Sequence, residues 1–422
     1  MDKMIVSGGQ ALCGEVQVSG AKNSALKMLF ASLLAEGEHV FHNVPNLADV
    51  ESASKLLEAL GSKVSFSKNT LRVTTAQRKA TEKNAAKADY ELVRKMRASI
   101  LCLGPLLAKQ GEAIVSLPGG CAIGSRPIDL HLEAMKALGA EVELKEGYVH
   151  AHAKRLRGTS FLFEKVTVGG TENMMMAATL AEGETVLENV AKEPEIGDLA
   201  EYLIKMGARI SGHGTSVIRI QGVEKLRPAE HTVIADRIEA GTLLIAGAIS
   251  KGEVTVKGCS PHLLEAFVGK IREAGFRVDL TENSMTVFPQ KSWKAVDITT
   301  APHPLFPTDL QAQFMALMTL AEGTSVITET VFENRFMHVT ELMRLGADIT
   351  PKTQVAVVRG KPGCLTGAPV MATDLRASAS LVLAGLAAQG DTTVNRIYHL
   401  DRGYEKLEEK LSLLGAKICR RA

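Results

Sequence analysis

The sequence is poor in aromatic residues and cysteines, and it carries almost no net charge. Of its 422 residues 45% are hydrophobic but only 4% are aromatic, so its cores must be packed from aliphatic side chains. This hydrophobic content excludes a disordered chain. The 49 Lys and Arg residues nearly balance the 47 Asp and Glu residues, so no general field attracts nucleic acid or an anionic membrane. Any anion must therefore be bound by local groups.

Disulfide, zinc and membrane signals are also missing. The six cysteines form neither a CxxC pair nor a Cys/His cluster, which predicts free thiols in a reducing compartment. No apolar run reaches the roughly 18 residues that a membrane span needs. Residues 1–6 lack the apolar core of a signal peptide. We therefore expect a soluble, cytoplasmic protein.

Six repeated units organise the chain, and two sets of glycines mark them. The first set follows apolar segments at Gly37, Gly111, Gly183, Gly252, Gly323 and Gly390; the second lies at Gly61, Gly139, Gly207, Gly275, Gly346 and Gly415. Members of the second set are 68 to 78 residues apart, which predicts six α/β units of helix, strand, helix, strand and a further strand. Gly is expected because it adopts the left-handed conformation that ends a helix. The units divide three and three near the polar stretch 222–232, which predicts two similar domains.

Polar or charged residues precede the first helix of the units. The segments are 19–23, 95–99, 169–173, 235–239, 307–311 and 373–378. Asp236 and Thr373 fit ordinary helix caps. Lys22, Arg97 and Arg376 do not, because the positive end of the helix dipole disfavours cations. An anion at these ends would resolve the conflict, so the pattern predicts a phosphate or carboxylate site between the two domains.

Residues 117–127 contain three glycines and two prolines, which predicts a flexible loop before a helix that begins near Pro127. A lone cysteine is usually a packing residue. The thiolate of Cys121 would be stabilised on an exposed loop near Arg126, which makes this cysteine a candidate acid, base or nucleophile. The other five cysteines are interpreted as packing residues.

Three further polar clusters, at residues 303–309, 329–338 and 398–404, lie between an apolar element and the next helix. Functional loops concentrate at such positions. Asp309 fits either a helix cap or a general base, and Arg335 and Arg402 also fit surface ion pairs. The histidines of these clusters lack the spacing of metal ligands, so we predict no metal site.

At these residues the sequence resembles the enolpyruvyl transferase family. The matching motifs are Ser19–Asn23, Met96–Ser99, Pro118–Pro127, Phe306–Phe314, Thr328–His338, Ala372–Ser380 and Asp401–Glu405. The resemblance covers nearly the whole chain. It implies two inside-out α/β barrels of three units each, with one domain at residues 22–234 and the other formed by residues 1–21 and 235–422.

The resemblance is closest to those members that act on UDP-N-acetylglucosamine. It implies transfer of the enolpyruvyl group of phosphoenolpyruvate to the 3′-hydroxyl of this nucleotide sugar with release of phosphate, the first committed step of peptidoglycan precursor synthesis. The chemistry needs protonation of the phosphoenolpyruvate methylene and deprotonation of the hydroxyl. The resemblance implies that Cys121 is the proton donor and Asp309 the general base. It implies no cofactor, nucleic acid, membrane or obligate protein partner.

The resemblance also assigns binding roles. It implies that Lys22, Arg126 and Arg402 hold the phosphate, with Lys22 and Arg402 also counted as catalytic, and that Arg335 and Arg376 hold the carboxylate end. The positions that match nucleotide-sugar contacts are Asn23, Arg97, Arg126, Pro127, Ile128, Asp129, Leu130, Lys165, Val166, Thr167, Val168, Asp309 and Val331.

Two alternatives remain at this point. One is enolpyruvyl transfer to shikimate 3-phosphate on the same fold, against which the Pro118–Cys121 motif counts. The other is a non-catalytic sensor of UDP-N-acetylglucosamine, which could have lost any of the catalytic residues that this chain retains. Phosphate release from phosphoenolpyruvate with each acceptor separates the three functions.

A cysteine at position 121 predicts covalent inactivation by the epoxide fosfomycin, because a thiolate can open the epoxide ring. Intact-mass measurement should show a single adduct on the treated protein and none on Cys121→Asp. Absence of an adduct, or an adduct on another residue, would contradict the role of Cys121.

Overall fold

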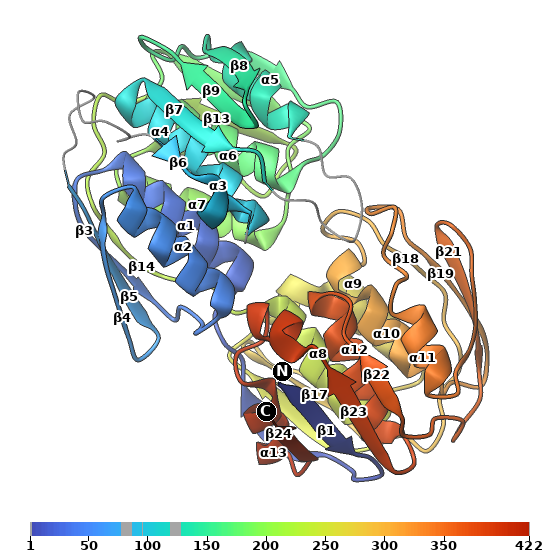
Figure 1. Cartoon of the computed structure of the whole chain (residues 1–422). Helices are drawn as coiled ribbons and strands as arrows, with labels where there is room; N and C mark the ends of the chain where they lie inside the picture. The colour runs from blue at the N-terminus through green and yellow to red at the C-terminus, as the bar shows by residue number, and fades with distance from the viewer. Residues whose placement is uncertain (1, 77–86, 95, 119–127, 422) are drawn as a thin grey trace. The chain divides into compact units, whose positions relative to one another are not determined.

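The computed structural model describes residues 2–76, 87–94, 96–118 and 128–421, which form two compact units (Figure 1). The N-terminal unit takes its described residues from 20–118 and 128–234. The C-terminal unit takes them from 2–19 and 235–421. Each unit is built around its own hydrophobic core. In each unit, helices lie in the middle and small sheets surround them.

The N-terminal unit contains three repeats. Its elements are α1 (Lys22–Ala31), η1 (Ser32–Leu34), β3 (Gly37–His42), α2 (Ala48–Ala59), β4 (Lys63–Ser67), β5 (Thr70–Thr75), β6 (Lys87–Ala88), α3 (Tyr90–Val93), η2 (Arg97–Cys102), α4 (Leu103–Gln110), β7 (Glu112–Ser116), α5 (Asp129–Ala137), β8 (Glu141–Lys145), β9 (Tyr148–His152), β10 (Ser160–Leu162), α6 (Val168–Ala178), β11 (Glu184–Glu188), α7 (Pro194–Lys205), β12 (Arg209–Ser211), β13 (Val217–Gln221) and β14 (Glu230–Thr232).

The C-terminal unit contains the other three. Its elements are β1 (Lys3–Ser7), β2 (Cys13–Gln17), α8 (Arg237–Ile249), β15 (Glu253–Lys257), η3 (Pro261–Leu264), α9 (Glu265–Glu273), β16 (Val278–Leu280), β17 (Ser284–Val287), β18 (Ile298–Thr299), η4 (Thr308–Leu310), α10 (Gln311–Met318), β19 (Gly323–Thr328), α11 (Val339–Arg344), β20 (Asp348–Pro351), β21 (Val355–Gly360), β22 (Pro369–Met371), α12 (Leu375–Ala387), β23 (Asp391–Asn395), η5 (Ile397–Arg402), α13 (Leu407–Leu413) and β24 (Lys417–Arg421).

All six four-stranded sheets share one pattern, which confirms the six predicted repeats. An edge strand runs parallel to its neighbour, and the remaining pairs are antiparallel; β18-β19-β21-β20 is an example, with Ile298 opposite Ile327 and Ile327 opposite Ala356. In four sheets, the parallel edge strand is the one that precedes the first helix of the same repeat. In the other two sheets, the parallel edge strand precedes the first helix of the other unit. The strand β2 precedes α1 but pairs with β15, whereas β14 precedes α8 but pairs with β3.

The strand β1 completes the sixth sheet, where it lies between β23 and β24 with Met4 opposite both Val394 and Arg420. The polar stretch 222–232 belongs to the N-terminal unit, and the chain passes from one unit to the other between Ile234 and Ala235. The sequence spacing carries no sign of these exchanges, because the repeat length is the same whichever unit an edge strand joins.

The first helices of the repeats are largely apolar and buried, which explains their central position. All thirteen residues of α8 and all eight of α10 are buried, and α8, α10 and α12 contact one another. A helix without a polar face must be surrounded. The second helix of a repeat is amphipathic instead; α7 buries Ile196, Leu199 and Leu203 at helical spacing.

The predicted glycine positions are largely confirmed. The six glycines of the second set directly follow a helix C-cap with φ between 89° and 108°, as Gly61 does after α2. In the first set only Gly252 lacks a positive φ, and Lys251 adopts it instead. Gly252 is needed for another reason, because a Cβ there would lie 1.8 Å from the Leu12 carbonyl oxygen.

Several predicted helix starts were wrong by a few residues. Residues 169–173 lie inside α6, which begins at Val168 with Thr167 as its cap. Asp374, not Thr373, caps α12. Arg97 opens the separate segment η2, which follows the short helix α3. A 3₁₀ segment and a short helix divide what the sequence presents as one apolar run.

The five described cysteines are free thiols. Burial raises the pKa of Cys102 and of Cys259 to about 12, so these two are packing residues, as predicted. The prediction was wrong for Cys13 and Cys419, which are exposed. No helix in the described part of the chain has both the length and the apolarity to span a bilayer.

An unusual ion pair lies in the core of the N-terminal unit. Glu172 of α6 is fully buried, and its Oε1 lies 3.4 Å from Nζ of Lys27 on α1. Neither carboxylate oxygen has a hydrogen-bond partner among the described residues. Burial raises the pKa of Glu172 to about 7, although Lys27 opposes the shift.

We expect this carboxyl group to make stability depend on pH. Its pKa in the folded chain lies above the 4.5 of an unperturbed Glu, so its contribution is complete below pH 4.5 and is lost as the pH rises through about 7. Relative to Glu172→Gln, the wild type should lose up to about 3 kcal/mol of unfolding free energy between pH 5 and pH 8. Guanidinium unfolding at both pH values measures the unfolding free energy of the wild type and of the variant. The exposed Glu38→Gln serves as the control. If the difference in unfolding free energy between the wild type and Glu172→Gln stayed constant across this pH range, a raised pKa of Glu172 would be contradicted.

Candidate functional site

Three predicted site residues meet in the C-terminal unit. Arg335 Nη2 donates to Asp309 Oδ1 at 2.8 Å, and Arg376 Nη2 and Nε donate to Oδ2 at 3.0 and 3.2 Å. The arginine side chains are only 6% and 4% exposed, whereas Asp309 is 26% exposed. The carboxylate is therefore the part of this cluster that faces solvent, and the two guanidiniums lie behind it.

The electrostatics of the cluster follow from this geometry. Burial alone would raise the pKa of Asp309, but the two guanidiniums outweigh burial and hold that pKa well below its usual range. Asp309 is therefore a firmly ionised carboxylate and a weak base in this arrangement. The same pairing raises the pKa of Arg376.

Glu329 organises the segments that carry Asp309 and Arg335. Its buried carboxylate accepts hydrogen bonds from the hydroxyls of Thr300 and Thr308, both at 2.8 Å, and from the backbone N–H groups of Val331 and Phe332. Thr308 also accepts from Arg335 Nη1 at 3.3 Å. One carboxylate thus fixes the turn after β19 against the residue that precedes Asp309.

Side chains from neighbouring helices form the wall behind Arg376. The ring of Tyr404 lies 5.3 Å from the guanidinium carbon, and its hydroxyl contacts Thr242 of α8 and Gln313 of α10. Gln313 Nε2 also donates to the Asp309 carbonyl oxygen at 2.9 Å. Nη1 of Arg376 is buried without a hydrogen-bond acceptor in the described part of the chain. Such an unused donor is costly unless a ligand satisfies it.

The predicted residues of the N-terminal unit lie at the starts of helical segments. Lys22 is the first residue of α1, and its Nζ lies 3.2 Å from Oδ2 of Asp49 in the first turn of α2. Arg97 opens η2, and Ile128 precedes α5. The remaining predicted positions are Asn23 in α1, Asp129 and Leu130 in α5, and Lys165, Val166, Thr167 and Val168 at the start of α6. Unpaired N–H groups at such ends favour anions.

Asp198 of α7 anchors the start of α1. Its carboxylate accepts from the Ser24 hydroxyl, from His231 Nε2 at 2.8 Å and from the Ile234 N–H at 3.2 Å. The importance of Asp198 and Asp49 is not visible in the sequence, because an acidic residue within a helix resembles a solvated surface charge. No local signal marks either one.

The other predicted residues are more dispersed. Val331 is 37% exposed on the turn that Glu329 holds, and Arg402 ends η5. Cys121, Arg126 and Pro127 lie outside the described residues. Among the residues that the structure describes, no group of three or more His, Cys, Asp or Glu side chains could hold a metal ion.

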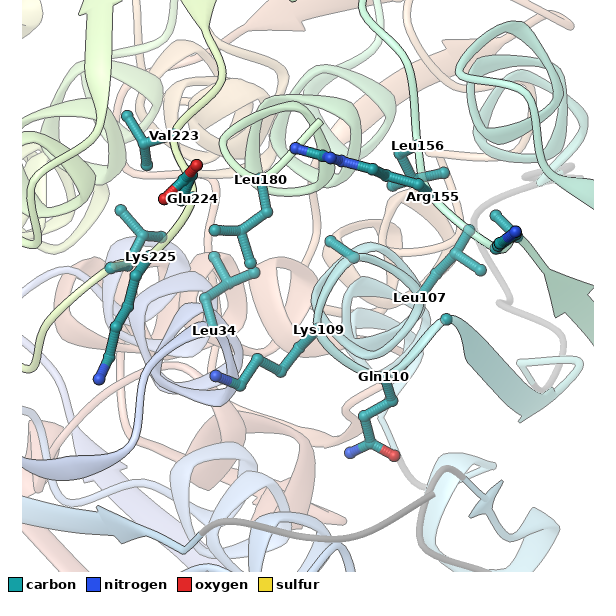
Figure 2. A pocket seen from close by; sticks show the side chains of 15 residues that line it. Leu34, Leu107, Lys109, Gln110, Arg155, Leu156, Leu180, Val223, Glu224 and Lys225 are labelled. Carbon is teal, nitrogen blue, oxygen red and sulfur yellow. The ribbon is translucent and has the colours of Figure 1, made fainter. Parts of the chain in front are cut away.

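A separate cavity of about 540 Å³ lies in the N-terminal unit (Figure 2). Its walls include Leu34, Gln110 and Leu180, which lie at or just after the C-terminal ends of the first helical segments of the repeats. The cationic side chains Lys109 and Arg155 also line it. Cations are favoured at helix C-termini without any ligand, because the dipole is negative there. None of the predicted site residues that the structure describes lines this cavity, so it is distinct from the candidate site.

Comparison with known proteins agrees with this fold. Residues 6–411 match the family EPSP synthase (3-phosphoshikimate 1-carboxyvinyltransferase). The chain is 70% identical over 417 residues to a UDP-N-acetylglucosamine 1-carboxyvinyltransferase of Bdellovibrio bacteriovorus, covering 99% of this chain and 100% of the relative. It is 57% identical to an Anaeromyxobacter protein of the same name, covering 100% of this chain and 99% of that protein.

A solved structure shares the whole fold. The crystal structure of the enolpyruvyl transferase NikO from Streptomyces tendae superimposes with a TM-score of 0.88 at 27% identity, covering 99% of this chain and 98% of that one. This confirms the predicted arrangement of two inside-out barrels. The chain therefore belongs to the enolpyruvyl transferase family.

Proposed function

We propose that the protein transfers the enolpyruvyl group of phosphoenolpyruvate to the 3′-hydroxyl of UDP-N-acetylglucosamine and releases phosphate. The observation that carries this proposal is the 70% identity, over essentially the full length of both chains, to a relative named for that activity. The reaction is the first committed step of peptidoglycan precursor synthesis, for which we propose a cytoplasmic location. The geometry of the described site supplies groups that this chemistry needs.

Arg335 and Arg376 are the proposed ligands of the phosphoenolpyruvate carboxylate. Both are buried and already arranged around a carboxylate, that of Asp309. Guanidinium groups match carboxylates with two parallel hydrogen bonds, and such bonds are strong where water is excluded. Lys22 and Arg402 are the proposed phosphate ligands, together with Arg126 of the loop outside the described residues.

Asp309 is the proposed general base for the sugar hydroxyl, and Cys121 the proposed proton donor to the methylene carbon. A proton leaves the hydroxyl as its oxygen attacks the central carbon, and a proton reaches the methylene. A tetrahedral adduct results. Loss of phosphate and of a methyl proton then restores the double bond in the product.

The two alternatives are less well supported. Relatives at 54–70% identity carry the name UDP-N-acetylglucosamine 1-carboxyvinyltransferase, which favours this acceptor over shikimate 3-phosphate. A non-catalytic sensor would not need two buried arginines around Asp309 if, as we propose, these groups bind a small carboxylate and not the sugar nucleotide.

We expect phosphate release from phosphoenolpyruvate only when UDP-N-acetylglucosamine is present. A coupled phosphate assay with the purified protein measures this, with each substrate alone and shikimate 3-phosphate as controls. Release that depends on shikimate 3-phosphate would establish the alternative acceptor. No release with either acceptor would favour the sensor.

Arg376→Lys should raise KM for phosphoenolpyruvate and lower kcat/KM about 10- to 100-fold, because lysine keeps the charge but loses the planar fork. KM for UDP-N-acetylglucosamine should stay nearly unchanged. The matched control is Arg359→Lys on β21, whose guanidinium is half-exposed and pairs with Asp348. Equal kinetics for the two variants would rule out a role of Arg376 in binding the carboxylate.

A further inference from the structure

Asp309 occupies a position that a substrate carboxylate also needs. It bridges the two buried guanidiniums, with Oδ1 on Arg335 and Oδ2 on Arg376. Since the arginine side chains are nearly inaccessible and Asp309 is the exposed member, an anion that arrives from solvent meets a carboxylate before it meets a guanidinium. A second carboxylate can reach these groups only if Asp309 gives up part of its contacts.

Arg376 shows where the second carboxylate would bind. Asp309 uses the Nε and Nη2 atoms of this guanidinium, and the buried Nη1 has no acceptor among the described residues. The Nη1/Nη2 edge is one of the two edges through which arginine binds a carboxylate with paired hydrogen bonds. To present this edge fully, Arg376 must release Nη2 from Asp309.

We propose that Asp309 is an internal stand-in for the substrate, and that the carboxylate of phosphoenolpyruvate displaces it from Arg376 on binding. This inference rests on the proposed function for the identity of the ligand. The exchange needs only a side-chain rotation, because the backbone of Asp309 is held in η4 by the hydrogen bond that its carbonyl oxygen accepts from Gln313.

The exchange couples binding to catalysis. While both guanidiniums hold Asp309, the carboxylate is a poor proton acceptor. Once the substrate takes Arg376, Asp309 keeps only Arg335, and its pKa rises toward the ordinary range. The base thus becomes effective when the carbon that the deprotonated hydroxyl will attack has arrived. This exchange lowers the affinity for the substrate, because every substrate carboxylate must compete with Asp309.

An ordinary structural ion pair predicts the opposite effect of mutation. If Asp309 only kept the arginines in place, its removal would loosen them and weaken carboxylate binding. If Asp309 competes with the substrate, its removal opens the site and strengthens binding, although turnover is lost. The variant Asp309→Asn separates the two cases, because it keeps the shape of the side chain and removes its charge.

The experiment measures Kd by isothermal titration without the sugar nucleotide. The probes are phosphoenolpyruvate, pyruvate, which has the carboxylate but no phosphate, and inorganic phosphate. We expect Asp309→Asn to bind phosphoenolpyruvate and pyruvate at least about tenfold more tightly than the wild type, with little change for inorganic phosphate. Unchanged or weaker binding of pyruvate would overturn the proposal, as would a gain for inorganic phosphate alone.

Two further variants test the assignment to Arg376. Glu329→Gln removes a buried carboxylate that touches Thr308 but forms no ion pair with either arginine, so it should give no tightening. Adding Arg376→Gln to Asp309→Asn should abolish the gain, because the released guanidinium is then missing. A gain that persists in the double variant would exclude Arg376 as the point of exchange.

A measurement on the wild type decides the question even if Asp309→Asn does not fold. In a crystal structure with phosphoenolpyruvate bound, the ligand carboxylate should contact Arg376, and Asp309 should retain Arg335 alone. Persistence of both original ion pairs would overturn the proposal. Absence of phosphate release would refute the proposed function but not the exchange, which the pyruvate affinities test independently.

Discussion

The burial of the largely apolar first helix of each repeat is the constraint on which the rest of the structure depends. Helices such as α8 and α10 cannot lie against solvent, so sheets and amphipathic helices must enclose them. Polar chemistry can then emerge only at their ends. Proposed site residues, among them Lys22 and Arg376, lie at the starts of these helices, and the C-terminal ends carry none of the predicted site residues that the structure describes.

The repeats and the helix ends were predictable because they depend on local chemistry. A glycine after a helix and an apolar run of eight or more residues keep their meaning in any context. The exchanged edge strands were not predictable from spacing, since β2 and β14 have the same spacing whichever sheet they join; only the family resemblance placed residues 1–21 with the C-terminal domain. The start of α6 was predicted too late, because its capping residue, Thr167, lies two residues before the glycines at which the helix was expected to begin.

The contacts among the predicted site residues of the C-terminal unit could not be read from the sequence. Asp309, Arg335 and Arg376 were identified through the family resemblance, yet Arg335 lies 26 positions from Asp309 and Arg376 lies 67 positions away, so no spacing rule connects them. Glu329 was noticed only as part of a polar cluster. Its function as the acceptor that joins two segments depends on the fold, because its donors come from Thr300, Thr308 and the turn after β19.

The exchange of edge strands has a consequence for synthesis on the ribosome. Residues 20–234 emerge as one continuous stretch that contains every strand of the N-terminal unit. The strands β1 and β2 are made before this stretch but belong to sheets whose other strands appear much later; Ser7 pairs with Asp391, 384 positions downstream. These two strands are thus synthesised before the N-terminal unit and find their partners only after it has emerged.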